Sequence, residues 1–261
     1  MSTYFIRIMQ EVIFKKKVSK GSRFNQVYIP KEMEKKIMVG DLVEVKLLKK
    51  HLDIYYHNQK RLSEFKEYLA KNIFSELMQF NGIKNAFIVG SFLYETTYND
   101  IDIVVISGKE NKKIEQILTE RFNQKFHIIC FSEEKLRLLI EKDPIIRSMF
   151  SQYLSGTKIN LNYKSCVDKN HIQFLLMMPE DLLEIELSSK IYYDNLRRLK
   201  TIRLFLENKS LDNPQIMGEM KKGIDKSLLR KIKNNGEINK EELKKIRNII
   251  KNDTKWVKKT I

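Results

Sequence analysis

Apolar and polar positions follow three different rhythms along the chain. In the first stretch apolar residues fall on every second position, over 4–8 and again over 43–47. A period of two is typical of strands with one buried face. The stretch up to about residue 50 is therefore predicted to be a small β-rich unit.

The segment between these two strands supplies turn signals. A strand over 26–29 meets Pro30, which cannot donate to a ladder but suits the first turn of a helix. A short helix over 31–37 should follow, and Gly40 and Asp41 should turn the chain into the last strand. The expected order is strand, short helix, turn and strand.

The second rhythm begins with residues 61–80, whose apolar positions lie three or four apart and end at Asn81 and Gly82, which predicts an amphipathic helix. Apolar runs and helical patterns then alternate. The expected strands span 86–91, 101–107, 125–131 and 158–163, and the expected helices 111–122, 133–141 and 143–153. This order predicts an α/β (α+β) core in which helices cover a sheet.

From Pro179 onward the pattern is almost entirely helical. An apolar stripe starts at Ile185, and breaks are expected at 213–218 and at 234–236, before a basic terminal helix. The sequence thus predicts three domains, over 1–50, 60–165 and 178–261, the last of them helical.

The formal charge of +16 is unevenly distributed. Lys and Arg outnumber Asp and Glu by 13 to 6 over 1–60 and by 20 to 9 over 190–261, whereas 61–189 holds 16 against 18. A near-neutral core between basic ends favours contact with phosphate-rich partners; a lysine-rich, highly soluble surface is the alternative. No stretch has the length and apolarity of a membrane span or signal region, so a cytoplasmic protein without membrane contact is expected.

The residues with the clearest chemistry lie in AFIVGSFLYETTYNDIDIVVIS. One apolar strand ends at Gly90 and Ser91, and the next begins with Asp100 and Asp102, which share a face because strand side chains alternate. Paired carboxylates suit Mg²⁺, which takes oxygen ligands and is often shared with phosphates. Gly90 permits close approach of the backbone to a triphosphate, and Ser91 and the next amides can donate to it.

This order of strand, Gly-Ser, short spacer and Asp-x-Asp resembles the nucleotidyltransferases of the DNA polymerase beta superfamily, small prokaryotic and archaeal type, over about 60–165. The resemblance implies transfer of a nucleoside monophosphate from an NTP to an RNA, protein or small-molecule acceptor, with Mg²⁺ or Mn²⁺ and with Asp100 and Asp102 as metal ligands. The strand 125–131 lacks the family's third carboxylate. His127 stands there, either as a general base or metal ligand or as a strand residue bonded to backbone or water.

The N-terminal unit, with its IPKE helix start and GDLVEV strand, resembles the SpoVT-AbrB family. The resemblance implies a swapped-hairpin barrel, hence a homodimer, that binds DNA; a dimerisation or substrate-handling module is the alternative. A family member would contact DNA phosphates through its basic stretch, here Lys15, Lys16, Lys17, Lys20 and Arg23.

The helical tail offers a second group of cations for RNA or for a triphosphate, although a solvated basic face is the alternative. These residues are Arg197, Arg198, Lys200 and Arg203, of which Arg197 and Lys200 are three apart and so share a helix face. Trp256 either stacks on a base or anchors the last helix. Two functions therefore compete: nucleotidyl transfer, or a catalytically impaired DNA-binding regulator or antitoxin that uses the core as an NTP sensor or platform.

Overall fold

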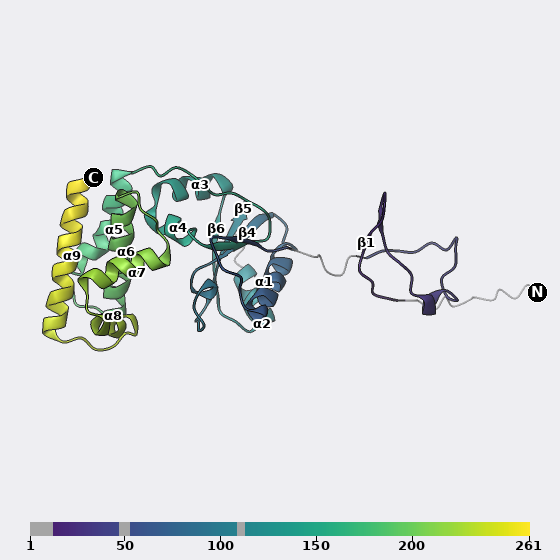
Figure 1. The fold of residues 1–261 in the computed structure, drawn as a ribbon, viewed down its shortest axis with the longest axis horizontal. Coiled ribbons are helices and arrows are strands. Elements are labelled where there is room, and N and C mark those ends of the chain that lie inside the picture. The colour runs from purple at the N-terminus through teal and green to yellow at the C-terminus, as the bar shows by residue number, and fades with distance from the viewer. Residues whose placement is uncertain (1–12, 47–52, 109–112) are drawn as a thin grey trace, which may run out of the picture. The chain divides into compact units, whose positions relative to one another are not determined.

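The computed structural model describes residues 13–46, 53–108 and 113–261. The chain divides into two compact units, 1–48 and 49–261, which are drawn in Figure 1 and described separately below. The strand expected over 4–8 and the last residue of the strand expected over 43–47 lie outside the described residues.

In the first unit, β1 (Ser19–Lys20) pairs antiparallel with β2 (Asn25–Gln26). The 3₁₀ helix η1 (Lys31–Met33) begins after Pro30, and Gly40 turns the chain with φ of 101°. Three expectations differ from the structure: the strand at 26–29 stops at Gln26, the helix at 31–37 is a 3₁₀ turn that stops at Met33, and residues 43–46 form no strand. A strand needs a neighbour for its backbone N–H and C=O groups, and no described strand of this unit lies beside residues 27–29 or 43–46.

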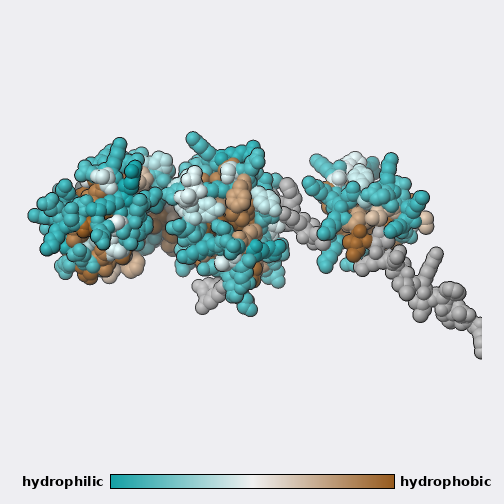
Figure 2. Space-filling view, turned by 90° about the horizontal axis from the view of Figure 1, so that it is seen from below, coloured by the Kyte–Doolittle hydropathy of each residue, from teal (hydrophilic) through white to brown (hydrophobic). Residues whose placement is uncertain are grey.

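This first unit has no buried residue among those described. Its apolar side chains lie at the surface, where the space-filling view shows them in brown (Figure 2). The large ones are Ile13, Val18, Phe24, Val27, Tyr28, Ile29, Met38, Val39, Leu42, Val43 and Val45, with exposed fractions from 37% to 108%. One copy of the unit therefore does not enclose a core within residues 13–46.

The second unit is built on a five-stranded mixed sheet of order β3-β7-β4-β5-β6. All neighbours are antiparallel except β5 and β6, which are parallel. The strands are β3 (Tyr55–His57), β4 (Ile83–Val89), β5 (Ile101–Ser107), β6 (Phe126–Phe131) and β7 (Tyr153–Ser155). This sheet and its helices make the protein a member of the mixed α/β class.

Helices cover both faces of this sheet. On one face α1 (Glu64–Leu77), capped by Ser63, and α2 (Lys113–Phe122) enclose a core that includes Ile101 and Ile103. On the other, α3 (Glu133–Lys142) and α4 (Pro144–Met149) enclose one that includes Val89 and Val104. Alternate residues of β5 thus serve opposite cores, as the apolar run 103–106 requires.

The strand expected over 158–163 is wrong. Residues 158–163 form no regular element, and the sheet is completed instead by β3 and β7. Both edges of β4 are occupied, by β5 and β7, and the outer edge of β7 is occupied by β3. The segment is held instead by side chains: Leu161 is buried beside Phe150, and Arg147 donates to the carbonyl of Tyr163 at 2.8 Å.

The rest of the chain is a helical layer with its own apolar core, which includes Tyr192, Leu196 and Ile250. Its helices are α5 (Lys169–Asp181), α6 (Ser189–Leu206), α7 (Asn213–Gly223), α8 (Lys226–Lys233) and α9 (Lys240–Thr260), shown in Figure 1. No helix in the described part of the chain is both long and apolar enough to cross a membrane.

Three details of this layer differ from the sequence prediction. The first helix starts at Lys169, where Asp168 caps it, so that Pro179 falls in its last turn. Ile185 is exposed in the connection that follows and is not part of the buried stripe. Gly218 lies within α7 and does not break it, because tertiary packing outweighs the roughly 1 kcal/mol that glycine costs a helix.

Candidate functional site

One end of the sheet brings the predicted site residues together. Val89, the last residue of β4, stands opposite Asp102, the second residue of β5. Asp102 in turn is in register with His127 on the parallel strand β6. Gly90 and Ser91 follow Val89 directly and start the 3₁₀ helix η2 (Ser91–Leu93). The strand ends therefore place Gly90, Asp102 and His127 in adjacent positions.

Only glycine can occupy position 90 without backbone strain. Its φ of 77° and ψ of −159° belong to a region populated essentially by glycine. A Cβ at this position would lie 2.2 Å from Oδ2 of Asp102. The turn after β4 is thus packed directly against the Asp102 carboxylate, an approach that any side chain would block.

The Asp102 carboxyl lies in an environment that opposes its ionisation. Its side chain is 27% exposed, and Nδ1 of His127 lies 3.1 Å from Oδ1. Burial raises the pKa of Asp102, and the negative charge of Asp100 raises it further, whereas the hydrogen bond with His127 lowers it. Two acids are therefore held together against their mutual repulsion, as often occurs at functional sites.

We expect His127→Ala to raise the pKa of Asp102 above its value in the unmodified protein. The substitution removes the hydrogen bond that favours the carboxylate and leaves burial and Asp100, which favour the protonated form. The carboxyl carbon of Asp102, followed by NMR across a pH series, should then titrate at higher pH. An unchanged midpoint would mean that His127 does not stabilise the carboxylate.

Asp100 and Asp102 match the ligand chemistry of Mg²⁺ and Mn²⁺, because both offer carboxylate oxygens and a cation would relieve their repulsion. Within the described ranges no group of three or more His, Cys, Asp or Glu residues is placed to hold a metal ion. The protein would therefore supply two acidic residues, and phosphate oxygens and water would complete the shell, as is usual for Mg²⁺.

The loop between the two motifs is fixed by Lys66 of α1 and by Gln59, which precedes this helix. Nζ of Lys66 donates to the carbonyls of Phe92 and Glu95, each at 2.6 Å. Nε2 of Gln59 donates to the carbonyl of Leu93 at 2.8 Å. Burial lowers the pKa of Lys66. Side chains from earlier in the sequence bind three carbonyls of residues 92–95. The path of the chain directly after Gly90 and Ser91 is therefore fixed.

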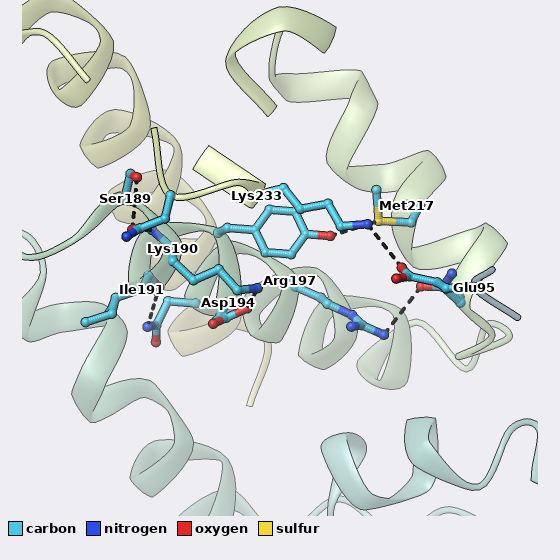
Figure 3. Close-up of polar contacts among 12 residues, drawn as sticks. Glu95, Ser189, Lys190, Ile191, Asp194, Arg197, Met217 and Lys233 are labelled. Carbon is cyan, nitrogen blue, oxygen red and sulfur yellow. Dashed lines mark hydrogen bonds and ion pairs between the residues drawn. The ribbon is translucent and has the colours of Figure 1, made fainter. Parts of the chain in front are cut away.

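The same loop contacts the helical layer. Nζ of Lys233 on α8 lies 3.1 Å from Oε1 of Glu95, an ion pair that raises the pKa of Lys233 (Figure 3). Tyr193 and Arg197 of α6 lie nearby, and Arg197 donates to Oδ1 of Asn213 at 3.4 Å. Cationic and aromatic side chains of the helices therefore border the loop that follows Gly90.

Of the four tail cations predicted to contact RNA or a triphosphate, Lys200 is buried and Arg203 is partly exposed but engaged in other contacts. Lys200 is 7% exposed and pairs with Asp253 at 2.6 Å, so it does not share a surface with Arg197. Arg203 pairs with Glu207 at 3.0 Å and with Asp253, and it stacks on Trp256. Trp256 packs against the core of the helical layer and thus anchors α9. The apolar residues of α6 decide which side of the helix faces the core, and Lys200 lies on that side. The basic composition of the segment could not show this.

The remaining predicted cations are at the surface. Arg197 and Arg198 are partly exposed. The basic stretch of the first unit, Lys15, Lys16, Lys17, Lys20 and Arg23, is exposed throughout. The nearest acids after β6, Glu133 and Glu134, are exposed at the start of α3.

Sequence reasoning missed Lys66, Gln59 and Lys233, which hold the loop in place. Their contacts join segments 26 to 138 residues apart, such as Lys66 with Phe92 and Lys233 with Glu95. No local pattern marks such pairs. Lys66 carries the one available signal, since it is a cation on the helix directly before the motif.

In three comparisons with known proteins, no family model, no curated protein and no solved structure matches this chain.

We expect Gly90→Ala to destabilise the protein by about 1–3 kcal/mol, because alanine would adopt a glycine-only conformation and its Cβ would displace the Asp102 carboxylate. Urea denaturation measures the loss. Gly218→Ala is the matched control, because nothing lies within 4 Å of its Cβ position and its helix should gain slightly. Equal stability of the two variants would contradict the close packing at Gly90.

Proposed function

We propose that this protein is a metal-dependent nucleotidyltransferase that moves a nucleoside monophosphate from an NTP to an acceptor. The observation that supports this most strongly is the contact between Gly90 and Asp102. This contact places a backbone turn that can approach phosphates directly against the Asp102 carboxylate. A second acid, Asp100, lies close enough to affect the pKa of Asp102. Phosphoryl transfer needs this combination, because its catalysis is mainly positioning and charge stabilisation.

Each residue then has a definite task. Asp100 and Asp102 would hold Mg²⁺ or Mn²⁺, which when bound supplies charge stabilisation to the phosphates. Gly90 and Ser91 would bring the backbone and a hydroxyl to the triphosphate. His127 would orient the Asp102 carboxylate through its bond at 3.1 Å. Arg197, beside the loop that follows, would favour the negative charge of the nucleotide.

The reaction requires no further reagent. An acceptor hydroxyl or phosphate oxygen forms a bond to the α-phosphorus, the bond from that phosphorus to the bridging oxygen breaks, and pyrophosphate leaves with that electron pair. The proton of a hydroxyl acceptor passes to a base. His127, whose side chain is 59% exposed beside Asp102, is the nearest such group in the described site.

One observation favours a second function, that of a DNA-binding regulator or antitoxin with an NTP-sensing core. His127 occupies the strand position across from Asp102, and no third carboxylate joins the two acids in the part of the chain that the structure describes. Loss of that carboxylate impairs transfer more than nucleotide binding. The exposed lysines of the first unit are available to DNA phosphates in either case.

Incubation of the full chain with α-labelled NTPs, Mg²⁺ or Mn²⁺, and RNA, protein or small-molecule acceptors distinguishes the two functions. Nucleotidyl transfer predicts label on an acceptor and no label with Asp102→Asn. Metal-dependent NTP binding that alters duplex DNA affinity without any labelled acceptor would support the regulator. Absence of both NTP binding and transfer would exclude both functions.

We also propose that the first unit makes the protein a homodimer. Its described residues enclose no core, and its apolar side chains would be covered if a second copy completed the sheet. Light scattering on the full chain should give a dimer mass at micromolar concentration, and Val43→Glu with Val45→Glu should give a monomer. A monomeric unmodified chain would exclude the interleaved arrangement.

A further inference from the structure

The outer side of α5 carries an apolar stripe that is exposed in the structure. Phe174, Met177 and Met178 are 66%, 59% and 39% exposed. They lie three and four residues apart and so share one face of the helix. The opposite face, with Ile172 and Leu176, is buried in the core of the helical layer. Helix α5 is therefore apolar on two sides, and the layer covers one of them.

The stripe continues beyond the end of α5. The amide of Ile185 donates to the carbonyl of Asp181 at 2.9 Å, a helical bond four residues long. Phe174, Met178 and Ile185 are thus spaced four and seven residues apart along one face. Ile185 is 53% exposed and Leu187 is 42% exposed. The apolar surface therefore extends over about three turns.

Side chains of α6 and α9 hold the backbone of the connection after α5 in place. Arg247 of α9 donates to the carbonyl of Leu182 at 3.1 Å and to that of Ile185 at 3.0 Å. The hydroxyl of Tyr192 donates to the same Ile185 carbonyl at 3.0 Å. With its backbone fixed by α6 and α9, the connection buries Leu182 in the core and leaves Ile185 and Leu187 exposed.

The charge around the stripe is opposite to that of the protein as a whole. The chain has 49 Lys and Arg residues, yet none lies within 170–189, whereas four acids do. Glu180 pairs with Lys258 of α9. Asp181, Glu184 and Glu186 are exposed along the stripe. Arg247 and Lys258 of α9 lie against the same segment, so the negative charge along the stripe comes from Asp181, Glu184 and Glu186.

We propose that the α5 stripe, formed by Phe174, Met177, Met178, Ile185 and Leu187, binds an amphipathic helix of a partner protein whose polar positions carry Lys and Arg. An apolar face of this length can bind a helix that carries apolar side chains at positions i, i+3, i+4 and i+7. Methionine adapts to such anchors, and the acidic border selects basic flanks. Pairing of two copies through this stripe would bring the acids Asp181, Glu184 and Glu186 of both copies together, and the same acids disfavour nucleic acid.

The test uses a fluorescent amphipathic peptide of about 18 residues, five turns, with Leu on one face and Lys on the other. Anisotropy should show binding to the full chain. Phe174→Ser with Met178→Ser should weaken binding at least about tenfold, as loss of a central anchor does. Glu184→Gln with Glu186→Gln should weaken it and reduce its salt dependence. Circular dichroism checks that these surface variants stay folded.

A matched control lies on α1, where Phe65 and Tyr68 form another exposed aromatic pair three residues apart, 68% and 66% exposed. Phe65→Ser with Tyr68→Ser should leave peptide binding unchanged. Equal loss in both double variants, or equal binding of a peptide with Glu in place of Lys, would overturn the proposal. A fall in the mass of the peptide-free chain in the Phe174 and Met178 variant would also overturn it, because the occupant would then be a second copy.

Discussion

With Asp100 and Asp102 both replaced by alanine, we expect metal-dependent NTP binding to disappear while the fold is retained. The two carboxylates are the proposed metal ligands, so their loss should remove the part of the affinity that depends on Mg²⁺. The fold should not suffer, because burial and mutual repulsion already oppose ionisation of Asp102. Calorimetry with Mg²⁺ and each NTP measures the affinity, and thermal unfolding measures the fold.

Glu133→Ala with Glu134→Ala is the control for this experiment. These acids are exposed at the start of α3, just after the strand that carries His127, and they change the net charge by the same amount. Their variant should bind NTP as the unmodified protein does. If the Asp100 and Asp102 variant keeps its metal-dependent affinity, the assignment of the site is wrong.

Lys200→Met should destabilise the protein by about 3 kcal/mol, the lower end of the range for removing one partner of a buried ion pair. Lys200 and Asp253 are 7% and 5% exposed, and the substitution leaves the Asp253 carboxylate buried without its closest cation. Arg203, 3.6 Å from the other oxygen of Asp253, should limit the loss. Urea denaturation of the full chain measures the change in the free energy of unfolding.

Helix α6 itself supplies the control, because Lys190 pairs with Asp194 at its exposed start. Lys190→Met should cost less than about 1 kcal/mol, since exposed pairs contribute little. Lys200→Met with Asp253→Leu should recover stability relative to the single variant, because no charge remains uncompensated. Similar losses from Lys190→Met and Lys200→Met would contradict the burial of the second pair.

The sequence predicted those parts of the fold in which the local pattern of apolar and turn residues favours the same structure as the tertiary packing does. The region around Gly90 and Asp102 is one example. An apolar strand, a glycine turn and a second apolar strand follow one another there, and this order determines which side chains of the strands are buried. The resemblance to nucleotidyltransferases placed His127 opposite Asp102, and the structure has the two residues in register on parallel strands. Chain breaks at Gly82 and Asn235, both with positive φ, were also visible as turn residues.

The failures came from partners that are distant in sequence. The segment 158–163 alternates as a strand does, but residues 153–155 pair with β4 and residues 55–57 pair with them in turn. Lys200 looks like Arg198 in the sequence, and only the packing of α6 against α9 shows that Lys200 is the buried one. Residues 43–46 have a strand pattern without a described strand beside them. Pairing and burial of this kind are tertiary effects that override local propensity.

The location of the bound metal is the most direct test of the proposed site. NMR spectra of the full chain with an NTP and substoichiometric Mn²⁺ should show amide signals broadened by the paramagnetic ion. The site assignment predicts the strongest broadening at Gly90, Ser91 and Asp102, with His127 next, and its absence when Mn²⁺ is added to the Asp100 and Asp102 double variant. Broadening centred elsewhere in the chain, or none in the presence of NTP, would contradict the assignment.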